Sequence, residues 1–431
     1  MRVYSARVVP LDAGRTWRAR TVEVPDPGPL LDRLPAGGSA WIRRGQGFVA
    51  LGTAVEISDV TIAEADAWWT GFSERLGHDT ELPDAWGTGP LALASFPFDA
   101  GNTGRLARVI VPRTILGRRG DVSWLTVLTD EREPIMEVPG AATPPVAPRV
   151  LDTEPFGLAA DDWASAVEEG RSRVAVGVLS KVVLARGETV ICDGPVDLRS
   201  PAAVLAREYE STWTYLMGGL VGGSPEMLVR RQGGLATSRV LAGTIPRNGG
   251  EQEDLRLAAS LARSGKNLIE HELAVASVAE AMAPLCSGMN VPDAPYVLQL
   301  PNVFHLASDV TGVCRPGITA LGLVARLHPS AAVCGTPTDA ARAAIAEIEH
   351  MDRGHYAGPV GWIDTRGDGE WAIALRSGEL AAGDPTRIRV YAGAGIVAES
   401  DPCEELAETG HKLAPMYTAL GLPTGRPAGR A

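Results

Sequence analysis

The sequence predicts an α+β protein with large sheets. β-rich segments recur along the whole chain, from SAWIRRGQGFVAL (39–51) to RIRVYAGAGIV (387–397). Helical segments are also present, but they do not alternate regularly with the strands, as they would around a parallel sheet. With 431 residues, 45% of them apolar, the chain is long enough to bury a deep core.

The N-terminal part, residues 1–132, is predicted to be β-rich. GPLALASFPF and RLARVIVPRTIL are typical strands separated by turns, and one helical stretch is expected near Ile62–Leu76. Residues 133–157 contain six prolines and few large apolar residues. This composition predicts a surface connection to the C-terminal part.

The C-terminal part, residues 158–420, mixes strands and helices. KVVLARGETVI (181–191) and EMLVRRQGGLATSRV (226–240) are predicted strands, and 359–377 is a predicted hairpin around Gly367-Asp368-Gly369. Residues 387–397 predict a strand that enters a glycine turn. The predicted helices are Asp254–Arg263, Lys266–Leu285, Thr338–His350 and Glu404–Leu413, the last bent or ended by Pro415. Residues 421–431 are an expected disordered tail.

Composition excludes several classes of function. The net charge of -12 lacks the basic footprint of a nucleic-acid-binding protein. There is no uncharged apolar run of 18 residues and no apolar core of a signal peptide, so we expect a cytoplasmic protein without a membrane span. Five widely spaced cysteines are a poor disulfide framework, and the absence of CxxC, HxH and HExxH argues against zinc.

The use of lysine is the most informative feature of the composition. Only three of the 40 basic residues are lysines: Lys181, Lys266 and Lys412. Arginine can replace most surface lysines, but it cannot replace a lysine that must lose its proton. The three lysines are therefore candidates for chemistry.

Two residues are candidates for acid–base work. Lys181 opens KVVLAR, where apolar neighbours would desolvate it and favour the neutral form that a general base needs; the alternative is an edge-strand lysine without chemistry. Glu226 lies at the turn GGSPEM, where the same surroundings would keep a carboxyl protonated as a general acid. The alternative is a solvated turn carboxylate.

Carboxylates on two predicted helices suggest a metal site. Glu270 lies on one helix, and Glu405 and Glu408 share a face of the last helix with Lys412. One carboxylate from each helix, completed by water and substrate oxygens, is the usual way of holding Mg²⁺. An ordinary ion pair between Glu408 and Lys412 is the alternative.

Glycines and one arginine suggest an anion site. Gly393 and Gly395 of YAGAGI can let backbone N–H groups approach a carboxylate, and GxGxxG is not completed. Arg376 at the end of WAIALR can clamp a carboxylate, although it is one of 37 arginines.

Taken together, nine segments of the chain resemble the chorismate-utilising enzymes. They occur in one order between about residues 175 and 420: KVVLAR, GGSPEMLVR, LAGTIPR, IEHEL, HPSAAVCGTP, YAGPVGW, ALRSGEL, YAGAGIV and DPCEELAETGHK. The likeness is greatest to isochorismate synthases of the menaquinone or siderophore type. The first 150 residues resemble the family only loosely.

The resemblance implies a fold and a role for each residue. The fold is one large two-lobed unit of two antiparallel sheets packed face to face, with helices outside. Lys181 matches the general base that activates water for attack at ring carbon 2, and Glu226 the acid that protonates the departing 4-hydroxyl. Glu270 and Glu408 match Mg²⁺ ligands, with Glu405 acting through water. The positions that match residues around the substrate are Gly243, Thr244, His305, Ala332, Tyr356, Arg376, Gly393, Gly395 and Lys412.

Departures from relatives narrow the activity. The PIKGT lysine of aminodeoxychorismate synthases is replaced by Ala242, the LLES motif of tryptophan-regulated anthranilate synthases is absent, and Ala332 stands where salicylate synthases have threonine. Some relatives place a further glutamate where this chain has Asn267. We therefore expect an Mg²⁺-dependent isochorismate synthase acting on chorismate, monomeric and without a glutaminase subunit. The alternatives are a salicylate synthase, component I of an anthranilate or aminodeoxychorismate synthase, or a non-catalytic chorismate-binding protein.

Overall fold

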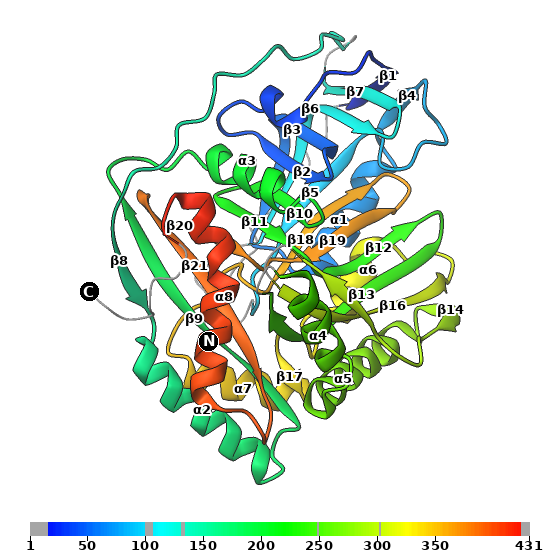
Figure 1. The fold of residues 1–431 in the computed structure, drawn as a ribbon. Coiled ribbons are helices and arrows are strands. Elements are labelled where there is room, and N and C mark those ends of the chain that lie inside the picture. The colour runs from blue at the N-terminus through cyan, green and yellow to red at the C-terminus, as the bar shows by residue number, and fades with distance from the viewer. Residues whose placement is uncertain (1–15, 100–106, 131–133, 248–249, 301–302, 424–431) are drawn as a thin grey trace.

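The computed structural model describes residues 16–99, 107–130, 134–247, 250–300 and 303–423 (Figure 1). The predicted tail from residue 424 onward lies outside the described residues. The α-helices of the described residues are α1 (Ile62–Ser73), α2 (Ala160–Ala175), α3 (Arg199–Glu208), α4 (Glu251–Leu261), α5 (Gly265–Met282), α6 (Ala320–Leu327), α7 (Thr338–Ile348) and α8 (Pro402–Leu420).

Strands make up the rest of the regular structure. Those before the proline-rich connection are β1 (Arg18–Glu23), β2 (Ser39–Arg43), β3 (Gln46–Ser58), β4 (Gly77–Thr80), β5 (Leu91–Ser95), β6 (Arg108–Arg119) and β7 (Val122–Thr129). Those that follow are β8 (Val150–Phe156), β9 (Lys181–Cys192), β10 (Trp213–Met217), β11 (Leu220–Ser224), β12 (Met227–Gln232), β13 (Leu235–Pro246), β14 (Cys286–Asn290), β15 (Tyr296–Gln299), β16 (Val303–Cys314), β17 (Gly335–Thr336), β18 (Pro359–Asp364), β19 (Gly369–Ile373), β20 (Ser377–Ala381) and β21 (Asp384–Ile396).

The strands form two largely antiparallel sheets that share β6. One sheet runs from β6 through β3, β2, β10, β11, β20 and β21 to β9. The other runs from β6 through β5, β18, β19, β12 and β13 to β16. Because β6 pairs with β3 on one edge and with β5 and β7 on the other, all described strands join one hydrogen-bonded network. Strands from both sides of the connection lie in both sheets.

The core lies between and outside these sheets, as expected for two sheets packed face to face. One apolar cluster joins Trp41 and Trp213 of the first sheet to Leu93 and Trp362 of the second. A second cluster packs α3 and α8 on the outer face of the first sheet. A third includes α1 and α6, which cover the second sheet. The predicted α+β class is therefore confirmed.

The structure corrects several predicted elements. The last helix, α8, does not end near Pro415 but continues to Leu420, because Met416 and Tyr417 are buried and hold the final turns in place. Its start is stabilised by Asp401, which accepts hydrogen bonds from two backbone N–H groups. The glycine turn expected near residue 393 is also wrong, since β21 continues through both glycines.

Other differences come from weak sequence signals. The end of the proline-rich connection forms β8, which pairs with β9. Helices α2, α3 and α6 were not predicted. The predicted hairpin at 359–377 is confirmed as β18 and β19.

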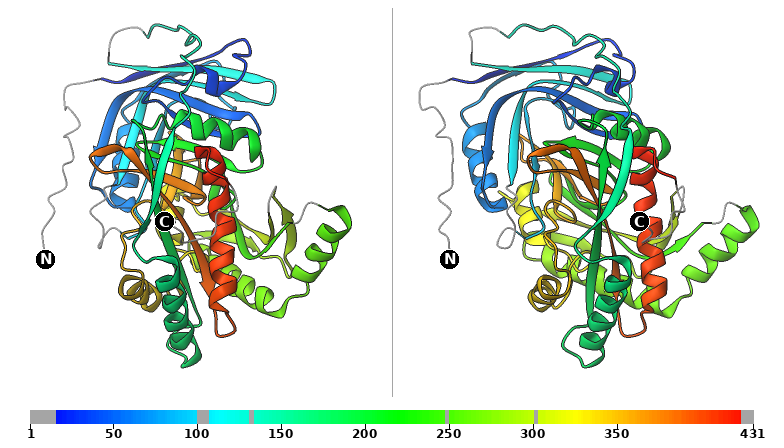
Figure 2. Two further views of the ribbon diagram at one scale, coloured as in Figure 1. Left: turned by 60° about the vertical axis from the view of Figure 1, so that its left-hand side comes forward. Right: turned by 90° about the vertical axis from the view of Figure 1, so that its left-hand side faces the viewer.

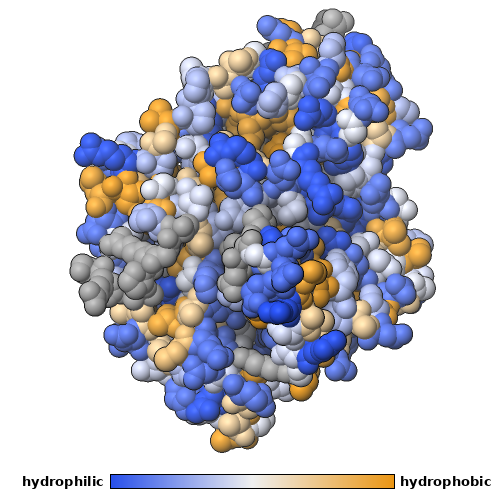
Figure 3. All heavy atoms as spheres, viewed as in Figure 1, coloured by the Kyte–Doolittle hydropathy of each residue, from blue (hydrophilic) through white to orange (hydrophobic). Residues whose placement is uncertain are grey.

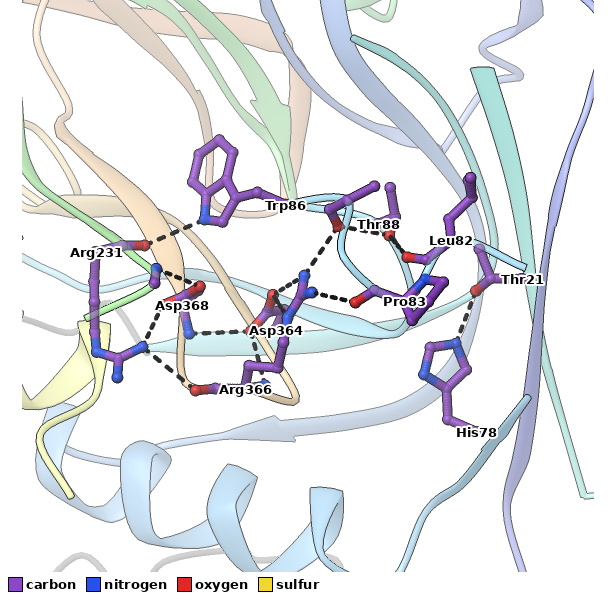
Figure 4. Close-up of polar contacts among 12 residues, drawn as sticks. Thr21, His78, Leu82, Pro83, Trp86, Thr88, Arg231, Asp364, Arg366 and Asp368 are labelled. Carbon is purple, nitrogen blue, oxygen red and sulfur yellow. Dashed lines mark hydrogen bonds and ion pairs between the residues drawn. The ribbon is translucent and has the colours of Figure 1, made fainter. Parts of the chain in front are cut away.

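The β18–β19 turn ties the second sheet to the N-terminal part (Figure 4). Arg366 pairs with Asp364 and donates to the carbonyls of Pro83 and Ala85. Arg231 of β12 pairs with Asp368 in the same turn. Buried Asp364 has a pKa raised to about 6, chiefly by burial, although Arg366 opposes that shift. These contacts fix the register of the hairpin whose far end leads to Arg376.

The surface seen in Figure 3 is mostly hydrophilic, with apolar residues in scattered groups. Among the described residues, no helix is both long enough and apolar enough to span a membrane. A cavity of about 530 Å³ opens beside β2, β3 and the start of α3, and none of the predicted site residues lines it.

Candidate active site

Lys181 lies buried at the start of β9, where its side chain meets a carboxylate from α5. Its Nζ is 2.9 Å from Oε1 of Glu270, an ion pair whose geometry does not satisfy a hydrogen bond. Lys181 is 0% exposed. The Lys181 amine thus has one carboxylate beside it and donor directions that no described residue takes up.

Gly395 of β21 makes this ion pair possible. A Cβ atom at this position would lie 2.5 Å from Oε1 of Glu270 and 2.8 Å from Cε of Lys181. Gly393, two residues earlier on the same face of the strand, would bring a Cβ to 3.2 Å from the hydroxyl of Tyr356. That these glycines present backbone N–H groups to an anion stays a prediction; the structure shows that they make room for side chains.

Glu226 lies in the turn between β11 and β12 and is only 5% exposed. Its backbone is held by Ser224, whose Oγ accepts from the Glu226 N–H. Burial raises the pKa of Glu226 to about 7, even though the positive charges of Lys181, Arg376 and Lys412 act to lower it. The carboxyl is therefore partly protonated near neutral pH, as a general acid requires.

Gly243 and Thr244 form a bulge in β13 opposite His305 of β16. Gly243 has a φ of +77°, and a Cβ there would lie 2.9 Å from Cβ of Asn267, so glycine is required. Oγ1 of Thr244 is 3.1 Å from Nδ1 of His305. The other ring nitrogen, Nε2, is buried and has no hydrogen-bond partner within the described part of the chain.

The charge state of His305 follows from its surroundings. Burial holds its pKa well below the ordinary value, and the positive charges of Arg376 and Lys412 act in the same direction. The imidazole is therefore neutral. A neutral ring with a free nitrogen can form a hydrogen bond with a substrate hydroxyl without adding charge.

Arg376 follows β19 with a φ of +49°, a strained backbone conformation for a residue with a side chain. It is buried, and no described residue accepts a hydrogen bond from its Nη2. Tyr356 stacks on Tyr391 with a centroid distance of 5.2 Å, and burial raises its pKa to about 12, so the phenol remains a neutral donor. A buried guanidinium with a free donor suits a carboxylate.

Lys412 joins α8 to β21. Its Nζ lies 2.6 Å from Oε1 of Glu408 and donates to the carbonyl oxygen of Gly393 at 2.9 Å. The simple ion pair between Glu408 and Lys412 is therefore present, and it lies beside the glycine strand. Glu405 is buried one turn earlier on the same helix.

Helix α5 brings Glu270 to Gly395 of β21, and α8 brings Glu408 to Lys412, whose Nζ contacts Gly393 two residues earlier on the same strand. Figure 2 shows α8 between α2 and the α4–α5 pair in both views. Among the described residues, no three or more His, Cys, Asp or Glu side chains gather closely enough to hold a metal ion by themselves. Two carboxylates supplemented by water and substrate oxygens nevertheless match the ligand chemistry of Mg²⁺.

Ala332 lies half-buried in the loop between α6 and β17 and packs with Leu375 against the apolar cluster around α6. The surroundings of Ala332 are thus apolar on the side of this cluster; its place in a substrate pocket stays a prediction.

Sequence reasoning missed a buried ion pair that contacts the backbone of β9, the strand that begins with Lys181. Glu349 accepts from the N–H of Ala185 at 2.7 Å and pairs with Arg353, which donates to the carbonyl oxygens of Val183 and Val333. Both charged side chains are almost fully buried. The available signal was the spacing of four residues between Glu349 and Arg353 just after α7.

Comparison with known proteins identifies the family. The family model described as "Chorismate binding enzyme" matches residues 41–421. The chain therefore belongs to the chorismate-binding enzymes, which confirms the resemblance drawn from its motifs.

Individual relatives are similar over most of the chain. Isochorismate synthase DhbC of Bacillus subtilis is 37% identical over 345 residues, which cover 77% of this chain and 81% of the relative. The solved structure of DhbC from Bacillus anthracis has 30% identity and a TM-score of 0.75, covering 91% of this chain and 99% of the other. MenF of Escherichia coli, at 24% identity and a TM-score of 0.78 over 94% of this chain and 95% of the other, shows the same fold.

Proposed function

We propose that this protein is an isochorismate synthase, which exchanges the 4-hydroxyl of chorismate for a hydroxyl at ring carbon 2. The observation that carries the proposal is that one site holds two buried ionisable side chains, one suited to act as a base and the other as an acid. Lys181 has free donor directions beside Glu270, and Glu226 has a pKa of about 7. The name of the B. subtilis relative, isochorismate synthase, supports the same activity.

Binding of the dianionic substrate rests on the cationic side of the site. In this proposal Arg376, with its free Nη2, and the neutral phenol of Tyr356 hold the enolpyruvyl carboxylate. His305, with its free Nε2, forms a hydrogen bond to the ring side. The donors are buried and fixed before substrate arrives, so little reorganisation is needed.

We propose that a metal ion binds the second carboxylate of the substrate, the one on the ring. We assign Glu270 and Glu408 as the protein ligands of Mg²⁺, with Glu405 contributing through water. A bound ion would supply positive charge for the ring carboxylate, and Glu270 would then face both that charge and Lys181. Lys412, already at Gly393, remains as the lysine at this end of the site.

Protons balance between the two buried groups. Lys181, in its neutral form, takes a proton from water as the water oxygen bonds to ring carbon 2. Both double bonds of the ring diene shift, from C1=C2 to C1=C6 and from C5=C6 to C4=C5, and the bond from carbon 4 to its hydroxyl breaks. Glu226 donates its proton to that hydroxyl, which leaves as water. One water is consumed and one is released. The side chains return to their starting states when Lys181 gives one proton to solvent and Glu226 takes one from it.

The test is incubation of the purified protein with chorismate and Mg²⁺ in the absence of ammonia, followed by chromatography of the products. We expect isochorismate, and no product in excess EDTA until Mg²⁺ is restored. Ala substitution of Glu270 or Glu408 should abolish turnover. Full activity in EDTA would exclude the metal assignment, and unchanged chorismate under all conditions would exclude the activity.

The proposal includes the setting of the reaction. We assign a monomeric cytoplasmic enzyme that needs no glutaminase subunit, with a product that feeds menaquinone or siderophore synthesis. Size-exclusion chromatography with light scattering tests the oligomeric state. Formation of anthranilate on addition of ammonia or of a glutaminase would contradict the assignment.

A further inference from the structure

We infer that Cys286 and Cys314 form a redox modification site, a reversible disulfide that closes across two neighbouring strands. Cys286 is the first residue of β14, and Cys314 is the last residue of β16. The two residues are direct partners in the antiparallel register of these strands. This inference does not depend on the proposed function.

The hydrogen-bond pattern shows which kind of strand pair this is. The N–H of Arg315 donates to the carbonyl oxygen of Leu285 on the β14 side, at 2.9 Å. The N–H of Cys314 points the opposite way and donates to the carbonyl oxygen of Gly234, at 2.7 Å. Since the backbone groups of Cys314 face away from β14, the pair of cysteines is a non-hydrogen-bonded pair.

Such a pair has the geometry that a disulfide needs. Directly opposed residues project their side chains from the same face of the sheet, and in non-hydrogen-bonded pairs the Cα atoms lie about 4.5 Å apart. Disulfides accept Cα separations of about 4.4–6.8 Å. The bridge between Cys286 and Cys314 can therefore form without a shift of either strand.

The surroundings hold the two sulfur atoms near each other. Gly312 lies on the same face as Cys314, and a Cβ atom there would be 2.9 Å from Cβ of Cys286 and 2.5 Å from Sδ of Met289. The Cys286 side chain thus occupies the space above Gly312. Burial and the neighbouring Cys314 thiol raise the pKa of Cys286 to about 11. Of the two thiols, Cys286 is buried and Cys314 is half-buried, so Cys314 is the one of the pair that solvent reaches first.

The chemistry needs a two-electron oxidant, for which hydrogen peroxide serves. The Cys314 sulfur attacks one peroxide oxygen, which gives a sulfenic acid and releases water. The Cys286 sulfur then attacks the Cys314 sulfur, forming the S–S bond and releasing a second water. Two thiols and one peroxide give one disulfide and two waters, and a dithiol reductant reverses the change.

The disulfide would connect β14 and β16, which are next to or part of elements that carry two residues of the candidate active site. β14 follows α5, which carries Glu270, and β16 carries His305. The disulfide would close a loop from residue 286 to residue 314 that includes β15. Because a closed loop restricts the unfolded chain, oxidation should raise the thermal midpoint of the protein.

The experiment uses the full chain, first fully reduced and then freed of reductant. One portion is treated with hydrogen peroxide, and all free thiols are alkylated before proteolysis and mass spectrometry. All five cysteines are free in the structure, so the reduced protein should carry five alkyl groups and the oxidised protein three. A peptide pair linked through Cys286 and Cys314 should appear, and a dithiol should restore five.

Matched variants separate this site from general oxidation. Cys334→Ser removes another buried thiol and should leave the linked peptide pair unchanged. Cys314→Ser should abolish it together with the oxidation-dependent rise in thermal midpoint. The inference is overturned if peroxide treatment of the folded wild-type protein leaves both Cys286 and Cys314 alkylatable, or links either to Cys192, Cys334 or Cys403.

Discussion

Replacing Gly395 by alanine is the sharpest perturbation of the geometry around Lys181. Ordinary van der Waals contact begins at about 3.4 Å, but the new Cβ would lie 2.5 Å from Oε1 of Glu270 and 2.8 Å from Cε of Lys181. The shortfalls are 3.4 − 2.5 = 0.9 Å and 3.4 − 2.8 = 0.6 Å. The glutamate or the lysine must therefore move by nearly one ångström, whereas β21 itself can remain in register with β9.

A displacement of this size is large for catalysis and small for folding. A misplacement of about 1 Å in a reacting group can cost on the order of 10²-fold in rate. We therefore expect Gly395→Ala to lower kcat by about 10²-fold. The thermal midpoint should stay near that of the wild-type protein, because only two side chains must shift.

The assay measures steady-state isochorismate formation at several Mg²⁺ concentrations, with thermal unfolding measured in parallel. Gly410→Ala is the matched control, since this glycine lies on α8 and a Cβ there meets nothing within 4 Å. The control should keep wild-type activity. If Gly395→Ala retains near-normal kcat, the placement of Lys181 against Glu270 is not needed for the reaction, and the argument for Lys181 as base fails.

Three further predictions concern protons and product. Lys181→Arg should bind chorismate yet lose at least ~10²-fold in kcat, because guanidinium cannot accept a proton; near-normal turnover would assign Lys181 a purely electrostatic role. Since the pKa of Glu226 is about 7 and the acid must be protonated, kcat should fall as pH rises above this value. Glu226→Gln, which has no such proton to donate, should not turn over. The wild-type protein should release little pyruvate in a lactate-dehydrogenase-coupled assay, because Ala332 offers no hydroxyl to hold an eliminating geometry. Ala332→Thr should raise pyruvate release, and stoichiometric pyruvate from the wild type would make it a salicylate synthase.

The sequence singled out residues of the candidate site without showing why they come together. Lys181 was singled out by its rarity and by its motif, and the structure places it beside Glu270; their roles as base and metal ligand stay predictions. What the sequence could not supply was the reason for Gly395. A missing Cβ has meaning only when the side chains that approach it from α5 and β9 are known.

Elements were missed where long-range packing outweighs local signals. Pro415 is a strong local signal for a helix end, yet burial of the residues that follow it carries α8 through to Leu420. The buried pair of Glu349 and Arg353 has ordinary helical spacing, and its importance depends on the carbonyl and N–H groups of β9 that it contacts. Neither the end of α8 nor the contacts of the Glu349–Arg353 pair can be deduced from residues that are close in sequence.

The central claim, attack of water at ring carbon 2 with loss of the 4-hydroxyl, is tested most directly by running the reaction in H₂¹⁸O. Mass spectrometry of the isochorismate, together with its fragmentation, locates the labelled oxygen. The account predicts one ¹⁸O atom per product molecule, at ring carbon 2, in the first turnover of Mg²⁺-supplied enzyme. Isochorismate that carries no label would show that the hydroxyl moves without exchange with water, and would contradict the assignment of Lys181 and Glu226 as base and acid.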